Sequence, residues 1–514
     1  MTDAQFDVVI IGTGAGGGTM ARALAGSRRR VLVLERGDFV PGEEQNWSPE
    51  AVWKQLRYRS TETWLDGLGR PFVPYTHYNV GGNTKFWGSV LYRLRREDFG
   101  ELAHRDGVSP AWPIDYETLA PYYDRAERWY QVHGAVGDDP TEPPREPYAH
   151  EAIPHAPGMA AIVEQLRAMG LHPSPLPLGL INPRAAGGCQ LCATCNSFPC
   201  RLDAKSDADI CGLRDALTHP TVTLWTGARA QRLVTARDGT RVEAVEVDRQ
   251  GEPVRVEAPL FVVSCGAVNS AALLLRSSSA SHPRGLANSS GLVGRRYMAH
   301  LATMMQGFHP WRRNQTVFQK TVAINDFYLP GPGRPYPLGQ IQSQGRTHGV
   351  MAKVVGDTLV PGIPLWAYDW WVGRGVDWLA MSEDLPDPDN RVTLEEDGRI
   401  RLAYRPNNVA AHRQLVGEAT RMLRRLGFWK VVTHSHQSRN TTHQCGTVVF
   451  GRDPATSVLD PFCRAHDVAN LFVVDASFFP SSAAVNPGLT IAAQALRVAD
   501  HIRRTEFRQA VEPS

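Results

Sequence analysis

Short apolar runs that do not alternate with polar residues occur at four places in the chain. They lie at residues 8–11, 31–34, 260–263 and 471–474. Such runs are typical of strands buried inside a sheet. Between the first two runs, Met20, Leu24 and Ala25 give a helix an apolar face. The pattern therefore predicts an α/β fold that begins with a strand, a helix and a second strand.

Other segments follow different periods. Short alternating strands, broken at residues 237–239 and 249–251, predict a hairpin-rich region across residues 222–258. Residues 300–430 are rich in aromatic residues and predict a largely antiparallel sheet, with strands at residues 340–342, 366–371 and 378–381. We expect helices at residues 116–130, 407–428 and 487–503.

The turn after the first strand is glycine-rich. Gly12 allows the tight turn, Gly14 lets the backbone approach a pyrophosphate, and Gly17 lets the helix pack closely on the sheet. Glu35 closes the second strand, where an acid accepts hydrogen bonds from ribose hydroxyls. Because an acid there disfavours a 2'-phosphate, the stretch predicts a site for NAD or FAD rather than NADP.

Composition narrows the class of partner. Among the 514 residues, 55 basic and 52 acidic side chains nearly cancel. Nucleic acid and membrane surfaces are therefore disfavoured as partners, and small molecules are favoured. The first strand begins within six residues of the N-terminus and no apolar run has the length of a membrane span. We expect no signal peptide and a soluble, cytoplasmic protein that is a monomer or a small homo-oligomer.

Further small and polar residues stand at the ends of predicted elements. A second glycine-rich segment at residues 79–88 contains Gly81, Gly82, Asn83, Thr84, Trp87 and Gly88. The other candidates for cofactor contact are Cys265, Ala267, Asp475 and Pro487. An HQCGT segment begins at His443, and Asn486 precedes the C-terminal helix.

Together these segments resemble the glucose-methanol-choline (GMC) oxidoreductase family, over most of the chain. The resemblance implies a Rossmann-like FAD-binding domain and a substrate-binding domain built on a largely antiparallel sheet with helices, similar to p-hydroxybenzoate hydroxylase. It also implies that the loop at residues 79–88 lies along the isoalloxazine. Fungal pyranose oxidases, which the loop resembles, have a covalently linked histidine where this chain has Phe86, so we expect non-covalent FAD.

On this basis we divide the chain into three parts. Residues 1–100, 200–299 and 431–514 form the FAD-binding domain. Residues 101–199 form a helical and cysteine-rich excursion packed on it, and residues 300–430 form the substrate-binding domain.

The resemblance places the chemistry on a histidine and an asparagine. Alcohol oxidation by a flavin needs a group that takes the hydroxyl proton while hydride goes to N5, and a neutral imidazole suits this task. We assign His443 as the base and Asn486 as the amide that orients the same oxygen. His434 and His436 are rivals that precede the motif, and we expect structural roles for both.

Five of the eight cysteines lie close together in the sequence, at Cys189, Cys192, Cys195, Cys200 and Cys211. Their spacing is compatible with an iron-sulfur cluster, as in related fructose and gluconate dehydrogenases, with a structural zinc, or with disulfides or packed thiols. We favour a structural role without a metal, although spacing leaves all three open.

The substrate is expected to be a pyranose sugar or glycoside. Its predicted contacts are Gln319, Asp326, Gln340 and Gln342, in a region whose tryptophans suit a sugar ring. The pattern is closest to bacterial pyranose and C-glycoside oxidases, which implies oxidation of a secondary ring hydroxyl, C3 or C2, with O2 as acceptor and H2O2 as product. The alternatives are a dehydrogenase that uses a quinone or an iron-sulfur relay, and a lyase on the same fold.

Overall fold

A five-stranded parallel sheet organises one half of the molecule, in the order β11-β2-β1-β15-β23. The computed structural model describes residues 6–356, 361–435 and 439–507. The strands are β1 (Val8–Ile11), β2 (Val31–Leu34), β11 (Val222–Trp225), β15 (Leu260–Val263) and β23 (Leu471–Val473). Four of them are the predicted apolar runs, and these four are buried along their whole length.

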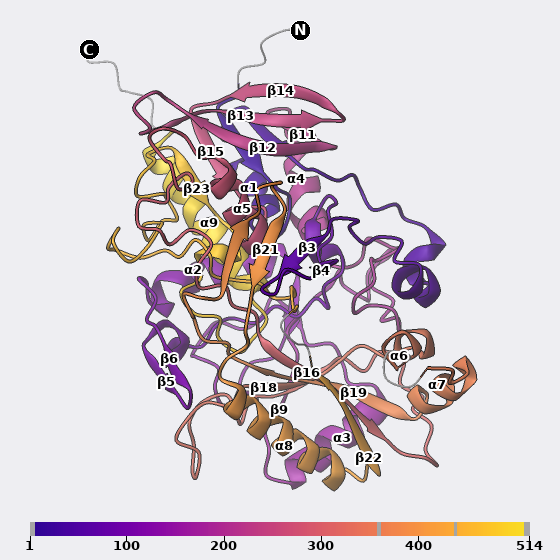
Figure 1. Cartoon of the computed structure of the whole chain (residues 1–514). Helices are drawn as coiled ribbons and strands as arrows, with labels where there is room; N and C mark the ends of the chain where they lie inside the picture. Colours follow the sequence, from indigo (N-terminus) through magenta and orange to yellow (C-terminus); the bar gives the residue numbers. More distant parts are fainter. Residues whose placement is uncertain (1–5, 357–360, 436–438, 508–514) are drawn as a thin grey trace.

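Five of the described α-helices belong to this half, and α2 among them packs on α9 rather than on the sheet (Figure 1). They are α1 (Ala15–Leu24), α2 (Tyr116–Trp129), α4 (Arg214–Ala216), α5 (Ala267–Arg276) and α9 (Gly488–Thr505). Helix α9 packs against both α1 and α2. A Cβ on Gly17 would lie 1.9 Å from the carbonyl oxygen of Gly12, so only glycine allows α1 to begin this close to the end of β1.

A six-stranded antiparallel sheet organises the other half, in the order β22-β16-β19-β18-β17-β9. Its strands are β9 (Pro173–Pro175), β16 (Leu301–Phe308), β17 (Val322–Ile324), β18 (Gln340–Ser343), β19 (Gly375–Ser382) and β22 (Lys430–Ser435). Two strands of the sheet therefore extend beyond residues 300–430: β9 comes before residue 300, and β22 begins at residue 430.

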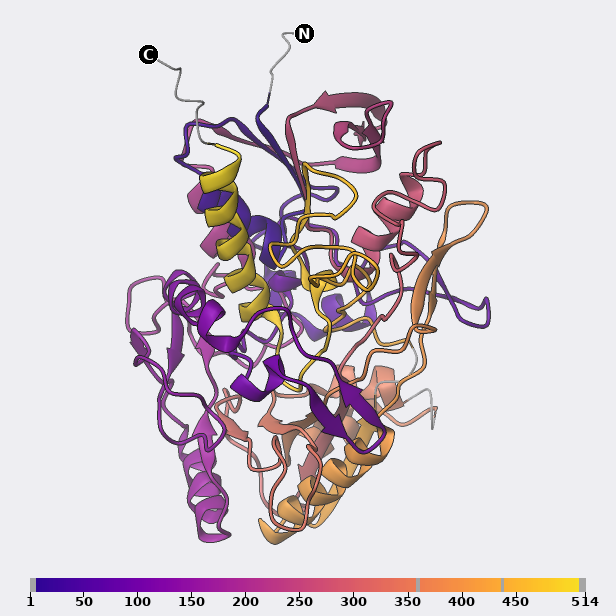
Figure 2. The same ribbon diagram turned by 90° about the vertical axis from the view of Figure 1, so that its left-hand side faces the viewer.

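The two faces of this sheet have different neighbours. Helices α3 (Pro157–Ala168) and α8 (Val409–Arg425) cover one face, at the end of the molecule farthest from the two termini (Figures 1 and 2). Ile341 and Trp378 point into that core. Because side chains alternate along a strand, Gln340 and Gln342 point to the opposite face, together with Ala323, which belongs to the core of the parallel-sheet half.

The remaining strands form smaller sheets. Strands β12 (Ala228–Thr235), β13 (Val242–Arg249) and β14 (Glu252–Glu257) form the predicted hairpins. Strands β20 (Arg391–Leu394), β21 (Ile400–Ala403), β3 (Trp64–Asp66) and β4 (Pro71–Phe72) form a four-stranded sheet. Strands β10 (Leu178–Gly179), β7 (Val132–Gly134) and β8 (His150–Glu151) form a third small sheet, and β5 (Leu102–His104) pairs with β6 (Gly107–Ser109).

The strand predicted at residues 366–371 is wrong. This segment is helix α7 (Leu365–Val372), which follows helix α6 (Gly349–Gly356). The ring of Trp371 stacks on Phe308, with centroids 4.0 Å apart, so packing against the end of β16 overrides the strand propensity of the aromatic residues. Among the described residues, no helix combines the length and the apolar character needed to cross a membrane.

Candidate active site

The turn between β1 and α1 has the shape of an anion cradle. Gly12 has φ +101°, and a Cβ on Gly14 would meet no atom within 4 Å. Helix α1 has no capping side chain and no acid in its first turn. Its first N–H groups and its positive dipole end are therefore available for a phosphate, so these residues fit the pyrophosphate of a dinucleotide.

A chain of hydrogen bonds joins this turn to the loop at residues 79–88. The buried Glu35 carboxylate accepts from the backbone N–H of Thr13 at 3.2 Å and from its hydroxyl at 2.5 Å. The same hydroxyl accepts from the N–H of Gly81 at 3.0 Å. Burial raises the pKa of Glu35, and the hydrogen bonds from Thr13 and Gly37 oppose that shift.

The loop itself approaches the turn closely. Gly81 and Gly82 have φ of +88° and +53°, and a Cβ on Gly82 would lie 3.5 Å from the Cα of Gly14. Asn83 accepts from the N–H of His77, and Thr84 donates to the Gly81 carbonyl. These contacts fix the backbone turn that brings the two glycine-rich segments together.

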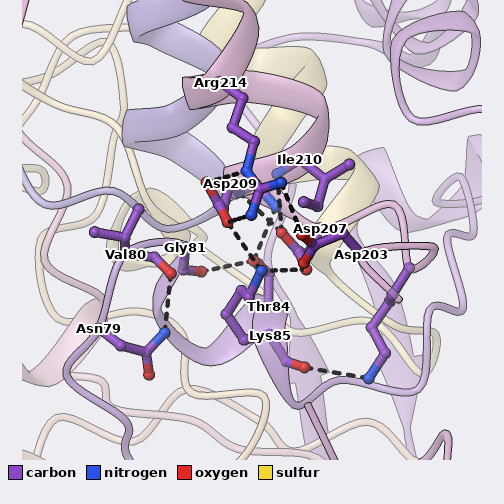
Figure 3. A network of polar contacts seen from close by, with 12 residues as sticks. Asn79, Val80, Gly81, Thr84, Lys85, Asp203, Asp207, Asp209, Ile210 and Arg214 are labelled. Atoms are coloured by element: carbon purple, nitrogen blue, oxygen red, sulfur yellow. Dashed lines mark hydrogen bonds and ion pairs between the residues drawn. The ribbon is translucent and has the colours of Figure 1, made fainter. Parts of the chain in front are cut away.

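A buried ion pair clamps the loop onto the segment that precedes α4 (Figure 3). The Nζ of Lys85 lies 3.1 Å from Asp207 Oδ2 and 2.9 Å from Asp209 Oδ2, and all three side chains are buried. Burial by itself lowers the pKa of Lys85, but the two carboxylates outweigh it and leave the pKa raised. Arg214 reaches Asp209 from the outside, at 3.2 Å.

The end of the loop contacts the start of the C-terminal helix. A Cβ on Gly488 would lie 2.6 Å from the ring of Trp87, so Trp87 packs directly beside Pro487 and the first turn of α9. Gly88 approaches the other half of the molecule, because a Cβ there would collide with the Nζ of the buried Lys320. Burial lowers the pKa of Lys320 to about 7.

The turn after β15 is held from two sides. Asp475 accepts from the N–H of Gly266 and the hydroxyl of Ser270, and the Cys265 thiol donates to the Ile11 carbonyl. Thr447 donates its hydroxyl to the carbonyl of Ala267 at 2.7 Å. The HQCGT segment is therefore fastened to the N-terminus of α5, which adjoins the cradle.

His443 is linked to the segment before Asn486 through His300, a residue that the sequence did not indicate. The Nδ1 atoms of His443 and His300 lie 2.9 Å apart, and Nε2 of His300 lies 3.0 Å from the Ser482 carbonyl oxygen. Ser482 belongs to the segment that leads to Asn486. His443 also has φ +50°, a left-handed conformation that is uncommon outside glycine and often marks functional sites.

Asn486 and the rival histidines lie in different surroundings. The Oδ1 atom of Asn486 is buried and has no hydrogen-bond partner within the part of the chain that the structure describes. His434 lies on the exposed strand β22. His436 lies outside the described residues.

The four predicted substrate contacts are not alike. Gln319 donates to Asp377 and accepts from Asn314, both at 2.9 Å. Gln340 donates to Asn325, and Asp326 accepts from the exposed His172. Only Gln342 is fully buried with both amide atoms lacking a partner among the described residues.

The predicted cysteine segment offers no metal site of the usual kind. All eight cysteines are free thiols in the structure. Burial raises the pKa of Cys189 to about 12, and the neighbouring Cys195, Cys192 and Cys200 add to the shift. Across residues 6–356, 361–435 and 439–507, no three or more His, Cys, Asp or Glu side chains are grouped so that they could hold a metal ion.

Sequence reasoning missed three residues that organise the site. Thr13 and Lys85 lie inside the two glycine-rich segments, so their positions in those motifs were a usable signal. His300 has no local signal, because it stands alone just before β16 and its partners are 143 and 182 residues away.

The cradle, the second glycine loop and the helix start define a Rossmann-like dinucleotide-binding protein. The chain belongs to the GMC oxidoreductase family, since family models with this description match residues 16–302 and 386–495. Members of this family are flavoproteins that typically bind FAD. The family and the fold class predicted from the sequence are thereby confirmed.

Similar proteins extend over almost the whole chain. The 6'''-hydroxyparomomycin C oxidase of Streptomyces lividus is 34% identical, with 97% of this chain and 92% of the relative covered. Paromamine 6'-oxidase of Streptomyces fradiae is also 34% identical, with 97% of this chain and 91% of the relative covered. Pyridoxine 4-oxidase from Mesorbium loti shares the fold, with a TM-score of 0.66 at 19% identity over 98% of this chain and all of that one.

Replacing Lys85 by methionine should destabilise the protein by about 3–5 kcal/mol, because Asp207 and Asp209 remain buried without their cation. Burial already raises the pKa of Asp207, and loss of Lys85 raises it further. A carboxyl group whose pKa is higher in the folded than in the unfolded protein favours the folded state at low pH, and this contribution to stability is lost as pH rises through the folded pKa. The deficit should therefore be larger at pH 8 than at pH 5, as measured by denaturant unfolding.

The matched control is Lys54→Met, which removes an exposed ion pair with Glu50 and should cost at most about 1 kcal/mol. Equal deficits for the two variants would show that the clamp does not stabilise the loop.

Proposed function

We propose that this protein oxidises a hydroxyl group of a pyranose sugar or glycoside, with FAD as a non-covalent cofactor and O2 as the acceptor, which yields H2O2. The observation that carries the proposal is the connection from His443 through His300 to Ser482, because it joins the segments of the two proposed catalytic residues. Membership of the GMC family and the sugar-directed names of the similar proteins support it.

Bound FAD supplies the hydride acceptor. The residues of the chain then have separate tasks. Gly12, Gly14 and Gly17 would hold the pyrophosphate in the cradle, Glu35 would accept hydrogen bonds from the ribose, and the loop from Gly81 to Gly88 would hold the flavin. His443 takes the hydroxyl proton, and Asn486 holds the same oxygen through its buried amide. The N-terminus of α9 is the positive end of the helix dipole, and it stabilises negative charge that develops next to it during the reaction.

A sugar fits the substrate side because of Gln342. A buried amide without partners costs free energy, and a hydroxyl that both donates and accepts would remove this cost on binding. Gln342 of β18 lies opposite Leu379 of β19, and Leu379 lies opposite Met304 of β16. Met304 is four residues after His300 in the sequence. We propose a secondary ring hydroxyl, C3 or C2, as the reacting group, in line with the resemblance to pyranose and C-glycoside oxidases.

A second candidate is oxidation of a primary hydroxyl at position 6' or 6''' of a compound such as paromamine or paromomycin. The names of two relatives that are 34% identical to this chain favour it. The two candidates share the same machinery and differ in the product, since a secondary hydroxyl gives a ketone and a primary hydroxyl gives an aldehyde.

The deciding experiment is anaerobic mixing of the purified protein with glucose, a C-glycoside and paromamine while the flavin absorbance is recorded, followed by NMR of the product. Bleaching by a sugar with a keto-sugar product is expected. An aldehyde from paromamine alone would select the second candidate, and turnover of non-carbohydrate alcohols only would exclude both.

Heat precipitation should release the FAD, and flavin in the pellet would contradict non-covalent binding.

His443→Ala should retain FAD but slow flavin reduction about a hundredfold or more, the scale for loss of a positioned base. Asn486→Ala should have a smaller effect. Stopped-flow absorbance measures both rates. The control is His434→Ala on the exposed strand β22, which should react at the native rate. A severe loss in His434→Ala with a normal rate in His443→Ala would move the base to another residue.

Gln342→Leu should raise KM for the sugar by roughly three- to tenfold, the loss expected for one hydrogen bond, with a smaller change in kcat. Its melting temperature should be unchanged or higher, because an unpaired buried amide is removed. Gln319→Leu is the control, since it deprives Asp377 of a donor and should lower the melting temperature with little effect on KM. An unchanged KM in Gln342→Leu for every sugar turned over would reject this contact.

A further inference from the structure

His300 is a buried histidine between the two proposed catalytic segments. It immediately precedes β16 and is 1% exposed. One ring nitrogen, Nε2, lies 3.0 Å from the carbonyl oxygen of Ser482, and the other, Nδ1, lies 2.9 Å from Nδ1 of His443. The two imidazole rings meet edge to face, at an angle of 83°.

These two contacts fix where the protons are. A carbonyl oxygen can only accept, so Nε2 of His300 must carry a hydrogen. Burial lowers the pKa of His300, which favours the neutral ring, and a neutral ring with a proton on Nε2 has a lone pair on Nδ1. The 2.9 Å contact is then a hydrogen bond in which Nδ1–H of His443 donates to His300.

We propose that His300 is a positioning residue that holds His443 in the Nδ1–H tautomer, so that Nε2 of His443 is the atom that accepts the substrate proton. This inference rests on the function proposed above. The opposite tautomer of His443 would set two lone pairs against each other across the contact. When Nε2 takes a proton, Nδ1–H continues to donate to His300, so no rearrangement is needed.

The surroundings hold His300 in place and keep this arrangement intact. Asn440 donates its side-chain amide to the His300 carbonyl oxygen at 3.2 Å, which ties His300 to the chain just before His443. Ser482 in turn exchanges hydrogen bonds with the backbone of Asp384.

The charged groups near the ring are already engaged. Glu383, whose charge acts on His300, binds Ser109 and His104. Asp384 accepts from Tyr404 and from the N–H of Ala299. With both carboxylates occupied by other donors, backbone carbonyls remain as acceptors for the ring: the Ser482 oxygen lies 3.0 Å from Nε2 of His300, and the backbone of Ala483 also interacts with the ring.

The direct test is 15N NMR of protein labelled at histidine, with the His443 signals identified by their loss in His443→Asn. The expected pattern is a protonated Nδ1 and an unprotonated Nε2 in His443, before any substrate is added. An Nε2–H tautomer in the native protein would overturn the proposal. This reading does not require turnover, so it stays decisive even if no sugar reduces the flavin and the proposed function fails.

The kinetic test compares two substitutions. His300→Leu removes the acceptor and should slow flavin reduction at least about tenfold with little change in KM, because only part of the molecules hold the productive tautomer. His300→Asn places an amide oxygen near the position of Nδ1 and should recover most of the rate. Native rates in His300→Leu would refute the role, and so would a failure of His300→Asn to exceed His300→Leu.

His412→Asn is the matched control. His412 is also buried and is also held at both ring nitrogens, by Thr303 and Ser382. His412 is a residue of α8, and it packs on the face of the sheet that this helix covers. Its substitution should leave the His443 tautomer and the rate unchanged. If His300→Leu does not fold, the NMR result and the His300→Asn rate still decide the question.

Discussion

The candidate site depends on the hydrogen bonds that the buried Glu35 carboxylate accepts. This carboxylate accepts two hydrogen bonds from Thr13 and one from Gly37, and Thr13 in turn accepts from Gly81. A buried acid requires such donors, because an unsatisfied charge in the interior is costly. The end of β2, the cradle and the second glycine loop are thus one hydrogen-bonded unit.

The position of that loop determines the contacts farther along it. Lys85 enters the interior opposite Asp207 and Asp209, and two residues later Trp87 rests on the first turn of α9. The helix that carries a positive end toward the site is therefore placed by the same loop that borders the cradle. A shift of the loop would move the helix start and the ion pair together.

The segment at residues 481–487 joins the two halves of the molecule. Trp112 donates to Ser481, His300 to Ser482, and the N–H of Ala484 to the hydroxyl of Tyr328. Two of these partners belong to the antiparallel half, while Asn486 stands at the start of α9 in the parallel half. The arrangement of the proposed catalytic residues therefore depends on how the two halves pack and not on either half alone.

The sequence by itself determined the strands, the glycine turns and the family, because these depend on short-range patterns: an apolar run, a residue without Cβ at a tight turn, an acid at a strand end. Local propensity failed for α7, where stacking on Phe308 decided the conformation. The tertiary structure alone separated Gln342 from Gln319 and Gln340, since which amide lacks a partner depends on neighbours from other strands. It alone brought Lys85 to Asp209 across 124 residues and His300 to His443 across 143, because side chains so far apart along the chain meet only where the folded backbone places them.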